Sequence, residues 1–277
     1  MAVFNMAIGL IIIGDEILSG KRKDAHFAKV VEILSARGLQ LGWAQYLGDD
    51  PAVITATLQR TLATDDIVFS CGGIGATPDD HTRQCAGAAL GIPLALHPDA
   101  KALIQERIRE MATKDGATEA LDSPANMHRL KMGEFPEGAA IVPNPFNKIP
   151  GFSLVNQSGK GVHYFVPGFP VMAWPMIEWA LDTHHAKLFH QVAHKEKSVL
   201  VFHAMESNLT PLMEAIEARY AGVKVFSLPS VGGNGVRKHI ELGVKGAADS
   251  LDDAYRHMIE GLQALDAPFE EVPPLNS

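Results

Sequence analysis

The sequence has little cysteine, no run of basic residues and no long apolar segment. Its two cysteines, Cys71 and Cys85, are too few for a disulfide framework and are not spaced as a Cys-x-x-Cys pair. The most apolar stretch, residues 7–13, is far shorter than the roughly 20 residues of a membrane-spanning helix and lacks the flanks of a secretory signal. We therefore expect a reduced, cytoplasmic protein that makes no contact with a membrane.

Positive charge is also scarce. The 277 residues carry 24 Lys and Arg against 32 Asp and Glu, which gives a formal net charge of −8. Because nucleic-acid-binding proteins normally show a basic balance or a basic stripe, we expect no nucleic acid partner. Apolar residues make up 47% and charged residues 20%, which is typical of a folded globular protein and excludes general disorder.

Strand and helix patterns alternate through the first part of the chain. Continuous apolar runs predict strands, and apolar residues at helical spacing predict helices between them. The main strands are expected at residues 7–13, 39–47, 66–71 and 161–166, with short strands at 140–142 and 152–155. The helices are expected at residues 25–37, 51–63, 78–90, 99–114 and 170–184. This alternation predicts parallel pairing with right-handed crossovers, and hence a doubly wound α/β domain.

A polar segment after residue 184 marks a change of organisation. We expect a first domain at residues 1–185, a small βαββα domain at 186–267 and a frayed tail at 268–277. The strands and helices of the small domain are expected at residues 197–204, 207–220, 223–228, 237–244 and 249–265.

Three acidic pairs follow three of the expected strands. They are Asp15-Glu16, Asp49-Asp50 and, just after a glycine loop, Asp79-Asp80. In an open parallel sheet, ligands bind outside the carboxyl ends of the strands, and carboxylates gathered there suit a hydrated cation such as Mg²⁺. A fourth pair, Asp65-Asp66, precedes its strand and is expected at the opposite edge.

Helix capping is the alternative explanation for two of these pairs. Thr77 and Pro78 are typical of an N-cap and a first helical position, and Asp80 stands close to a capping-box position. Asp49-Asp50 precedes Pro51 in the same way. Asp15-Glu16 is expected to open a loop, so capping explains this pair less well. Both interpretations stay open at this point.

A glycine loop connects the third strand to the following helix. Gly72-Gly73-Ile74-Gly75, followed by Thr77, places bare backbone amides where they could hold an anion. The loop is not a Rossmann fingerprint, because Pro78 stands where a third glycine is required. It does not follow the P-loop pattern either, and a simple tight turn explains it equally well.

These motifs together resemble the CinA family of competence/damage-inducible proteins. The resemblance rests on the segments at residues 14–20, 48–50 and 72–82, on Pro143-Asn144-Pro145 and on Pro167-Gly168-Phe169-Pro170, all in the expected order. It implies a three-layer, mostly parallel fold shared with the molybdopterin-binding domains of molybdenum-cofactor biosynthesis. The chain departs from the family pattern at residues 24–26 and 146–149.

The resemblance also implies a divalent-metal-dependent pyrophosphatase that acts on ADP-ribose-like nucleotides. We expect Asp15, Asp79 and Asp80 to be catalytic, and Asp15, Glu16, Asp79 and Asp80 to hold Mg²⁺, Mn²⁺ or Co²⁺. The residues expected to bind phosphate or ligand are Gly14, Gly72, Gly73, Gly75, Thr77, Asn144 and Gly168.

Two other functions use the same pocket. One is a non-catalytic module that binds molybdopterin or a nucleotide, and the other is adenylyl transfer to molybdopterin. For each function the expected partner is a small nucleotide or pterin, and we expect the chain to form a homodimer. Full-length CinA proteins add a C-terminal amidase domain, for which 277 residues leave no room, so we expect no amidase activity.

Overall fold

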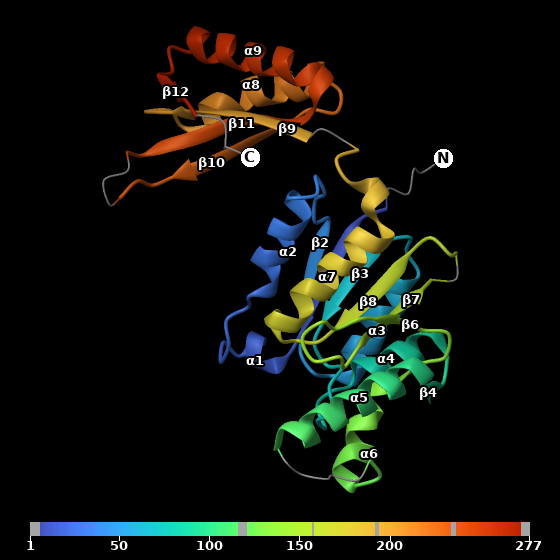
Figure 1. Cartoon of the computed structure of the whole chain (residues 1–277). Coiled ribbons are helices and arrows are strands. Elements are labelled where there is room, and N and C mark those ends of the chain that lie inside the picture. The colour runs from blue at the N-terminus through green and yellow to red at the C-terminus, as the bar shows by residue number, and fades with distance from the viewer. Residues whose placement is uncertain (1–5, 116–120, 157, 192–193, 234–236, 273–277) are drawn as a thin grey trace. The chain divides into compact units, whose positions relative to one another are not determined.

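The chain folds into two compact units. The computed structural model describes residues 6–115, 121–156, 158–191, 194–233 and 237–272 (Figure 1). The first unit is Met1–Phe189 and the second is His190–Ser277. From the sequence, the second domain is expected to begin at residue 186, a few residues earlier. In the described part of the chain, no helix is both long enough and apolar enough to cross a membrane.

The first unit is built on a mixed, mostly parallel sheet, as the sequence predicts. Its strands in spatial order are β2 (Trp43–Leu47), β1 (Ile8–Ile13), β3 (Ile67–Cys71), β8 (Val162–Val166), β7 (Gly151–Val155) and β6 (Ala140–Val142). The first four pair in parallel, and β7 and β6 are antiparallel to their neighbours. The carboxyl ends of β1, β2, β3 and β8 therefore meet at one edge of the sheet.

Helices cover both faces of this sheet, which makes three layers (Figure 1). Because successive side chains of a strand point to opposite faces, Leu10 and Ile12 of β1 pack into one core and Ile11 and Ile13 into another. The helices on the first face are α2 (His26–Ser35) and α7 (Pro170–His184); those on the second are α3 (Pro51–Leu62), α4 (Thr82–Leu90) and α5 (Pro98–Asp115). All of β1 is buried, which explains its continuous apolar run.

Several elements of the first unit differ from the sequence expectation. Residues 15–18 form a short helix, α1 (Asp15–Leu18), where a loop is expected. The helix α4 begins at Thr82 rather than at residue 78, because residues 77–80 form a separate turn. The short elements not foreseen are β4 (Leu94–Leu96), β5 (Glu134–Pro136), α6 (Pro124–Leu130) and the 3₁₀ turns η1 (Lys131–Gly133) and η2 (Ala186–Leu188).

The second unit is a small antiparallel sheet with two helices. Its elements along the chain are β9 (His194–Val201), α8 (Glu206–Arg219), β10 (Lys224–Ser230), β11 (His239–Ala247), α9 (Ala248–Ala264) and β12 (Phe269–Glu271). The spatial order of the strands is β10-β11-β9-β12. Both helices pack on the same core, which contains Leu209, Ile216 and Met258.

The expectation of a frayed tail at 268–277 is wrong for its first part. Residues 269–271 form β12, which pairs with β9, and the Phe202 amide donates to the Pro268 carbonyl over 2.8 Å. Phe269 packs against the core of the second unit, and its burial offsets the entropy cost of ordering this segment. Residues 273–277 lie outside the described residues.

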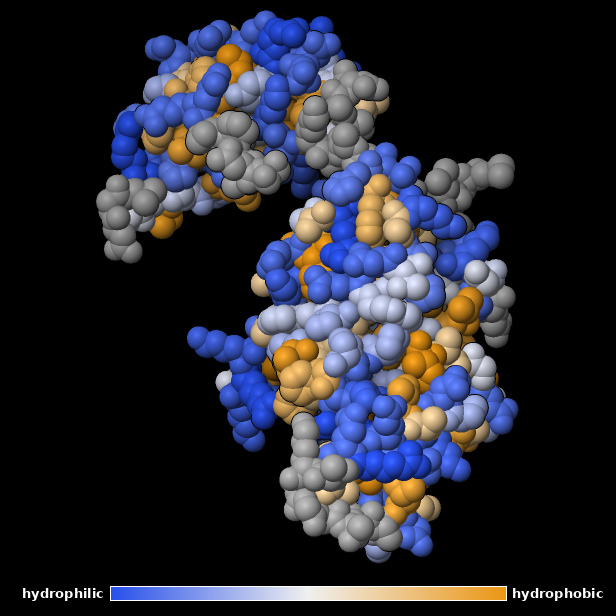
Figure 2. Space-filling view, viewed as in Figure 1, coloured by the Kyte–Doolittle hydropathy of each residue, from blue (hydrophilic) through white to orange (hydrophobic). Residues whose placement is uncertain are grey.

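The surface is mainly polar on the face shown in Figure 2, where apolar side chains form separate small groups. Phe146, Phe169 and Val171 are among the exposed large apolar residues of the first unit. Phe169 follows β8 and also lines the cavity that is described next.

Candidate functional site at the carboxyl edge of the first unit

The glycine loop after β3 fits into a space that no larger residue could occupy. Gly72 has a φ of 112°, and a Cβ atom there would lie 2.3 Å from the Ile13 carbonyl oxygen. Gly73 has a φ of 70°, and its Cβ would lie 2.2 Å from Thr82 Oγ1. The loop is therefore wedged between the end of β1 and the beginning of α4, and both positions require glycine.

Only part of this loop has amides that are free to bind a ligand. The Gly72 amide donates to the Val166 carbonyl over 3.0 Å, and the Thr77 amide donates to Asp80 Oδ2 over 2.8 Å. No described residue accepts a hydrogen bond from the amides of Gly73 or Gly75. Of the four positions expected to bind phosphate through their amides, Gly73 and Gly75 therefore have an available donor.

A cavity of about 150 Å³ opens beside this loop, at the carboxyl ends of the parallel strands. We call it the acidic cavity. The residues that line it are Ile13, Gly14, Glu16, Arg22, Asp49, Gly72, Gly73, Asp79, Asp80, Gly168 and Phe169. The acidic pairs that follow β1, β2 and the glycine loop thus each contribute to one cavity, and its position agrees with the general rule for open α/β sheets.

Asp15 does not line the acidic cavity, although we expected it to be catalytic. Its Oδ1 accepts a hydrogen bond from the Asp49 amide over 3.2 Å, and its own amide donates to Asp49 Oδ2 over 2.9 Å. A Cβ at Gly48 would lie 2.5 Å from Asp15 Oδ1, so the carboxylate points toward the end of β2. Asp15 ties the ends of two neighbouring strands together.

The two residues of the acidic pair after β2, Asp49 and Asp50, have different roles. Asp50 is the N-cap of α3, and its Oδ1 accepts hydrogen bonds from the amides of Ala52 and Val53 over 2.8 and 3.2 Å. Asp49 instead lines the acidic cavity. Capping therefore accounts for Asp50 alone, and sequence reasoning missed Asp49 because it treated the two residues as one unit.

The carboxylates around the acidic cavity repel one another. Burial is the main cause that raises the pKa of the Asp49 carboxyl, while the hydrogen bond from the Asp15 amide lowers it. The negative charges of Asp15, Glu16 and Asp79 raise this pKa further. Acidic groups from β1, β2 and the glycine loop are thus close enough to interact electrostatically, so a bound cation would relieve the repulsion.

Asp80 and Thr77 form a turn instead of the start of a helix. The Thr77 hydroxyl donates to Asp80 Oδ2 over 2.5 Å, and the Asp80 amide donates back to the Thr77 carbonyl over 3.0 Å. A Cβ at Gly75 would lie 2.5 Å from Asp80 Oδ2. The interpretation of Thr77 as the N-cap of α4 is therefore wrong; His81 holds that position.

A second cavity, of about 320 Å³, shares Asp80 with the first. We call it the adjoining cavity. Its lining residues are Ala76, Thr77, Pro78, Asp80, His81, Arg83, Gln84, His128, Lys131 and Glu134. It is richer in cationic and imidazole groups than the acidic cavity, and the two together offer both charges around the glycine loop.

Arg83 links the adjoining cavity to the glycine loop. Only 3% of Arg83 is exposed, and its guanidinium donates to the Gly75 carbonyl over 2.6 Å and to the Lys131 carbonyl. Burial lowers the pKa of this guanidinium, and the negative charges of Asp80 and Glu134 oppose the shift. Sequence reasoning missed Arg83, since a single arginine in a helix gives no signal of its burial.

Asn144 lies within its own loop and does not line either of these cavities. Its Nδ2 donates to Asn147 Oδ1 over 2.8 Å and to the Ile149 carbonyl over 3.0 Å, and its Oδ1 accepts from the Phe146 amide over 3.0 Å. The structure therefore places Asn144, which is expected from the sequence to bind phosphate or ligand, outside the linings of both cavities. Its side chain is 4% exposed, and its hydrogen bonds shape the loop at residues 144–149.

Gly168 does line the acidic cavity, and His26 holds it in place. The His26 Nε2 lies 2.9 Å from the Gly168 carbonyl oxygen, so the imidazole donates a hydrogen bond to this turn. Gly168 is also close to the glycine loop, because a Cβ there would lie 3.4 Å from Gly72 Cα. His26 belongs to the segment in which the sequence departs from the CinA pattern.

The donor set around the acidic cavity consists of carboxylate oxygens. Within the described residues, no group of three or more His, Cys, Asp or Glu side chains is placed to hold a metal ion by itself. Mg²⁺ commonly binds through one or two carboxylates together with waters and substrate phosphates, so it does not need a complete protein cage. The cavity therefore fits a hydrated cation whose coordination a phosphate ligand completes.

Comparison with known proteins agrees with the fold and with these motifs. A CinA-like protein of Anaeromyxobacter dehalogenans (strain 2CP-C) is 32% identical over 222 residues, which cover 79% of this chain and 51% of the relative. A CinA-like protein of Gloeobacter violaceus is 27% identical over 93% of this chain and 58% of the relative. The chain thus spans about half the length of the curated relatives it matches.

A solved structure and a family model each match about two thirds of the chain. The crystal structure of the protein CinA with unknown function from Thermoplasma acidophilum superimposes with a TM-score of 0.53 at 27% identity, over 64% of this chain and 96% of that one. The family described as "Probable molybdopterin binding domain" matches residues 9–184. The chain is therefore CinA-like and belongs to this probable molybdopterin-binding domain family.

Proposed function

We propose that the first unit is a divalent-metal-dependent pyrophosphatase that hydrolyses ADP-ribose-like nucleotides. The observation that carries the proposal is the acidic cavity, where Glu16, Asp49 and Asp79 crowd together beside the open amides of Gly73 and Gly75. Crowded carboxylates favour a cation, and free amides at a glycine loop favour a phosphate. A pyrophosphate with a bound metal ion would supply the cation for the carboxylates and the phosphate for the amides.

One or two of the carboxylates of Glu16, Asp49 and Asp79 would hold the metal, with waters and substrate phosphate as its other ligands. This set revises the sequence expectation of Asp15, Glu16, Asp79 and Asp80, because Asp15 bonds to the end of β2 and Asp80 bonds to Thr77. When bound, a divalent cation polarises phosphoryl oxygens and lowers the pKa of an attacking water. A carboxylate of the set that does not hold the metal can accept a proton from that water.

The remaining contacts orient the substrate. Gly73 and Gly75 would donate their amides to one phosphate, and Arg22, which lines the acidic cavity, would pair with the other. The adjoining cavity, with His128 and Lys131 in its lining, would take the body of the nucleotide. Phe169 would limit the access of bulk water from the side of β8.

A non-catalytic binding module is the second candidate. It is favoured by the hydrogen bonds of Asp50, which caps α3, and of Asp80, which closes the turn at residues 77–80, because both carboxylates serve backbone groups. In that case the two cavities would hold molybdopterin or a nucleotide without cleaving it, in keeping with the matched family of probable molybdopterin binding domains. Adenylyl transfer to molybdopterin would use the same residues with a second substrate.

Product analysis separates these functions. The full chain is incubated with ADP-ribose, FAD or NAD, with Mg²⁺, Mn²⁺, Co²⁺ or EDTA, and released AMP is measured. We expect metal-dependent release of AMP and a loss of roughly 10- to 100-fold in rate for Asp79→Asn and Asp49→Asn.

The matched control is Asp50→Asn. Asparagine is as good an N-cap as aspartate, so this variant should keep both its fold and its activity. Equal rates in all three variants and the wild type would contradict the proposed metal site. Binding of a nucleotide or pterin without turnover under any of the metals would select the non-catalytic module.

A further inference from the structure

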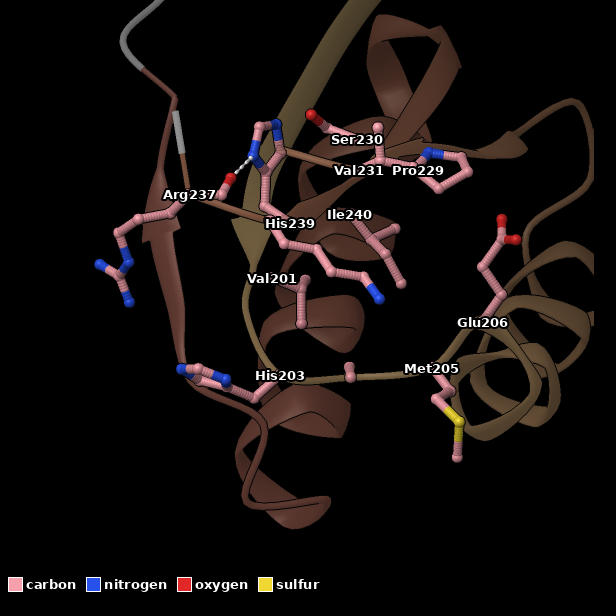
Figure 3. Close-up of a pocket in the computed structure, with 12 residues that line it drawn as sticks. Val201, His203, Met205, Glu206, Pro229, Ser230, Val231, Arg237, His239 and Ile240 are labelled. Carbon is pink, nitrogen blue, oxygen red and sulfur yellow. Dashed lines mark hydrogen bonds between the residues drawn. The ribbon is translucent and has the colours of Figure 1, made fainter. Parts of the chain in front are cut away.

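The second unit contains a pocket of its own, of about 710 Å³. It lies where β9 and β10 end and where α8 and β11 begin (Figure 3). We call it the small-unit pocket. The residues that line it are Val201, His203, Ala204, Met205, Glu206, Pro229, Ser230, Val231, Arg237, Lys238, His239 and Ile240. Its volume falls within the range of roughly 300–1,000 Å³ that is typical of small-molecule sites.

Opposite charges occupy opposite sides of this pocket. Arg237, His203 and His239 lie together on one side, and Glu206 lies on the other (Figure 3). Lys238 also lines the pocket and makes no hydrogen bond or ion pair with any described residue. In a protein with a net charge of −8, this gathering of basic groups in one pocket indicates an anionic ligand.

The basic side of the pocket is held in a defined conformation. The Arg237 guanidinium lies 4.1 Å from the centroid of the Phe202 ring and pairs with Glu270 over 3.2 Å. The Arg237 carbonyl accepts a hydrogen bond from His239 Nδ1 over 2.7 Å, which leaves His239 Nε2 for a ligand. His203 adopts a left-handed φ of 57°, which is uncommon for a residue other than glycine.

Apolar side chains make up the rest of the lining. Val201 and Ile240 are buried members of the core, and Met205 and Pro229 lie beside Glu206. The Glu206 carboxylate accepts a hydrogen bond from Ser227 Oγ over 2.6 Å, which fixes its Oε1 and leaves Oε2 for a donor group. Such a lining suits a flat apolar ring that carries an amino or hydroxyl group.

We propose that the small-unit pocket binds a phosphomonoester with a planar heterocyclic body, of the class of nucleoside monophosphates. Lys238 would bind the phosphate together with His203, and His239 Nε2 would donate to it when the imidazole carries both protons, since Nδ1 already donates to the Arg237 carbonyl. The apolar lining would contact the ring. Glu206 would accept a hydrogen bond from an amino or hydroxyl group of the ligand. This site lies entirely in the second unit and uses none of the residues of the proposed pyrophosphatase.

Isoleucine methyl NMR of the full chain tests this proposal. Ile240 lines the small-unit pocket and Ile13 lines the acidic cavity, so their δ1 methyl groups report on the two sites separately. The probes are AMP, adenosine and inorganic phosphate, without added metal. We expect AMP to shift the Ile240 methyl with a saturable dependence, and adenosine and phosphate to bind at least about tenfold more weakly.

The variants are Lys238→Glu and, as a matched control, Lys245→Glu. Both residues are exposed, and Lys245 lies on β11 away from the pocket. Lys238→Glu should weaken the AMP response of Ile240 by about tenfold or more, and Lys245→Glu should leave it unchanged.

Three outcomes would overturn the proposal. An Ile240 methyl that does not move with AMP would remove the site, and equal losses in the two variants would remove the role of Lys238. Inorganic phosphate that binds as tightly as AMP would remove the contact with the ring. A shift of Ile13 alone would leave the proposed function of the first unit standing while this proposal fails.

Discussion

The two units of this chain form their cavities from different materials. In the first unit, glycines, strand ends and carboxylates that accept from backbone amides, such as those of Asp49 and Asp80, surround a narrow space of about 150 Å³. In the second unit, long cationic and apolar side chains surround about 710 Å³. The shape of the first cavity is set by backbone conformation, and the shape of the second is set by the packing of side chains from separate elements.

This difference decides what a sequence can reveal. A cavity shaped by backbone leaves a local pattern, because close approach demands glycine and a strand end demands a turn residue. Gly72 and Gly73 are therefore visible in the sequence as parts of one motif. His203 and Lys238 are separated by more than thirty positions and follow no shared pattern, so only the folded chain brings them together.

The largest effect should come from a methyl group added to the backbone-built cavity. In Gly72→Ala, the new Cβ would lie 2.3 Å from the Ile13 carbonyl oxygen at a φ of 112°, so the backbone must shift. We expect a loss of about 3 kcal/mol in the unfolding free energy of the first unit. All three tryptophans of the chain lie in this unit, so the denaturation curve followed by tryptophan fluorescence reports on it alone.

Gly20→Ala is the control for this change. Gly20 also has a positive φ, of 72°, but a Cβ there would meet nothing within 4 Å. Its cost should be only about 1 kcal/mol, from the left-handed conformation itself. Equal losses in the two variants would mean that crowding at the glycine loop contributes nothing.

A somewhat smaller loss of stability is expected when Asn144 is replaced. This substitution tests whether Asn144 supports the loop or binds the ligand. Asn144→Ala removes the two hydrogen bonds that Nδ2 donates and the one that Oδ1 accepts, all made by a buried residue. We expect a loss of about 2 kcal/mol in unfolding free energy with an unchanged rate of AMP release. Asp79→Asn should behave in the opposite way, so a fall in rate with Asn144→Ala alone would restore Asn144 to the site.

The main elements of the fold could be predicted from local pattern. The continuous apolar run of β1 and the helical spacing in α2 and α3 survive in the structure, because each element buries most of a face. The strands β4, β5 and β12 have three residues each and are not predicted, whereas β6, of the same length, is expected at residues 140–142. β12 forms because Phe269 packs against a core to which β9, β11 and both helices of the second unit also contribute.

The site was predictable only down to the level of the motif. The sequence places the acidic pair Asp49-Asp50 at a strand end, but the direction of each side chain depends on where α3 begins. Asp50 caps the helix, and Asp49 is left to line the cavity. Arg83 could not be foreseen, because its partner carbonyls, of Gly75 and Lys131, come from separate parts of the fold.

A buried histidine should give the first unit a pH dependence of its own. His163 is fully buried beside Thr61, and burial lowers its pKa to about 3, whereas the unfolded chain titrates near 6.5. Below about pH 6.5 His163 is protonated in the unfolded chain, whereas in the folded unit it stays neutral down to about pH 3. Stability should therefore fall by about 1.4 kcal/mol for each pH unit across this window.

His163→Gln should remove this part of the slope of unfolding free energy against pH, measured by tryptophan fluorescence between pH 6 and pH 4. His185, whose pKa burial lowers to about 4, keeps its own contribution in both proteins. His239→Gln, in the second unit, is the control and should leave the slope unchanged. An unchanged slope in His163→Gln would mean that the folded unit takes up a proton at this histidine.

The smallest effect is expected where the second unit relies on an exposed side chain. Arg237, which precedes β11, contacts the Phe202 ring at the end of β9 and forms an ion pair with Glu270 of β12, and both charged partners are largely exposed. Because solvent screens such contacts, Arg237→Ala should cost only about 0.5–1 kcal/mol. The Phe202 amide, which donates to the Pro268 carbonyl, should then exchange its hydrogen about two- to fivefold faster.

Arg256→Ala removes a similarly exposed ion pair, with Asp253 on the same helix, and should leave this exchange rate unchanged because it does not contact β12. Equal acceleration of Phe202 amide exchange in the two variants would contradict this prediction. It would show that the loss of any surface charge loosens the second unit, and that the contacts of Arg237 do not specifically stabilise β12.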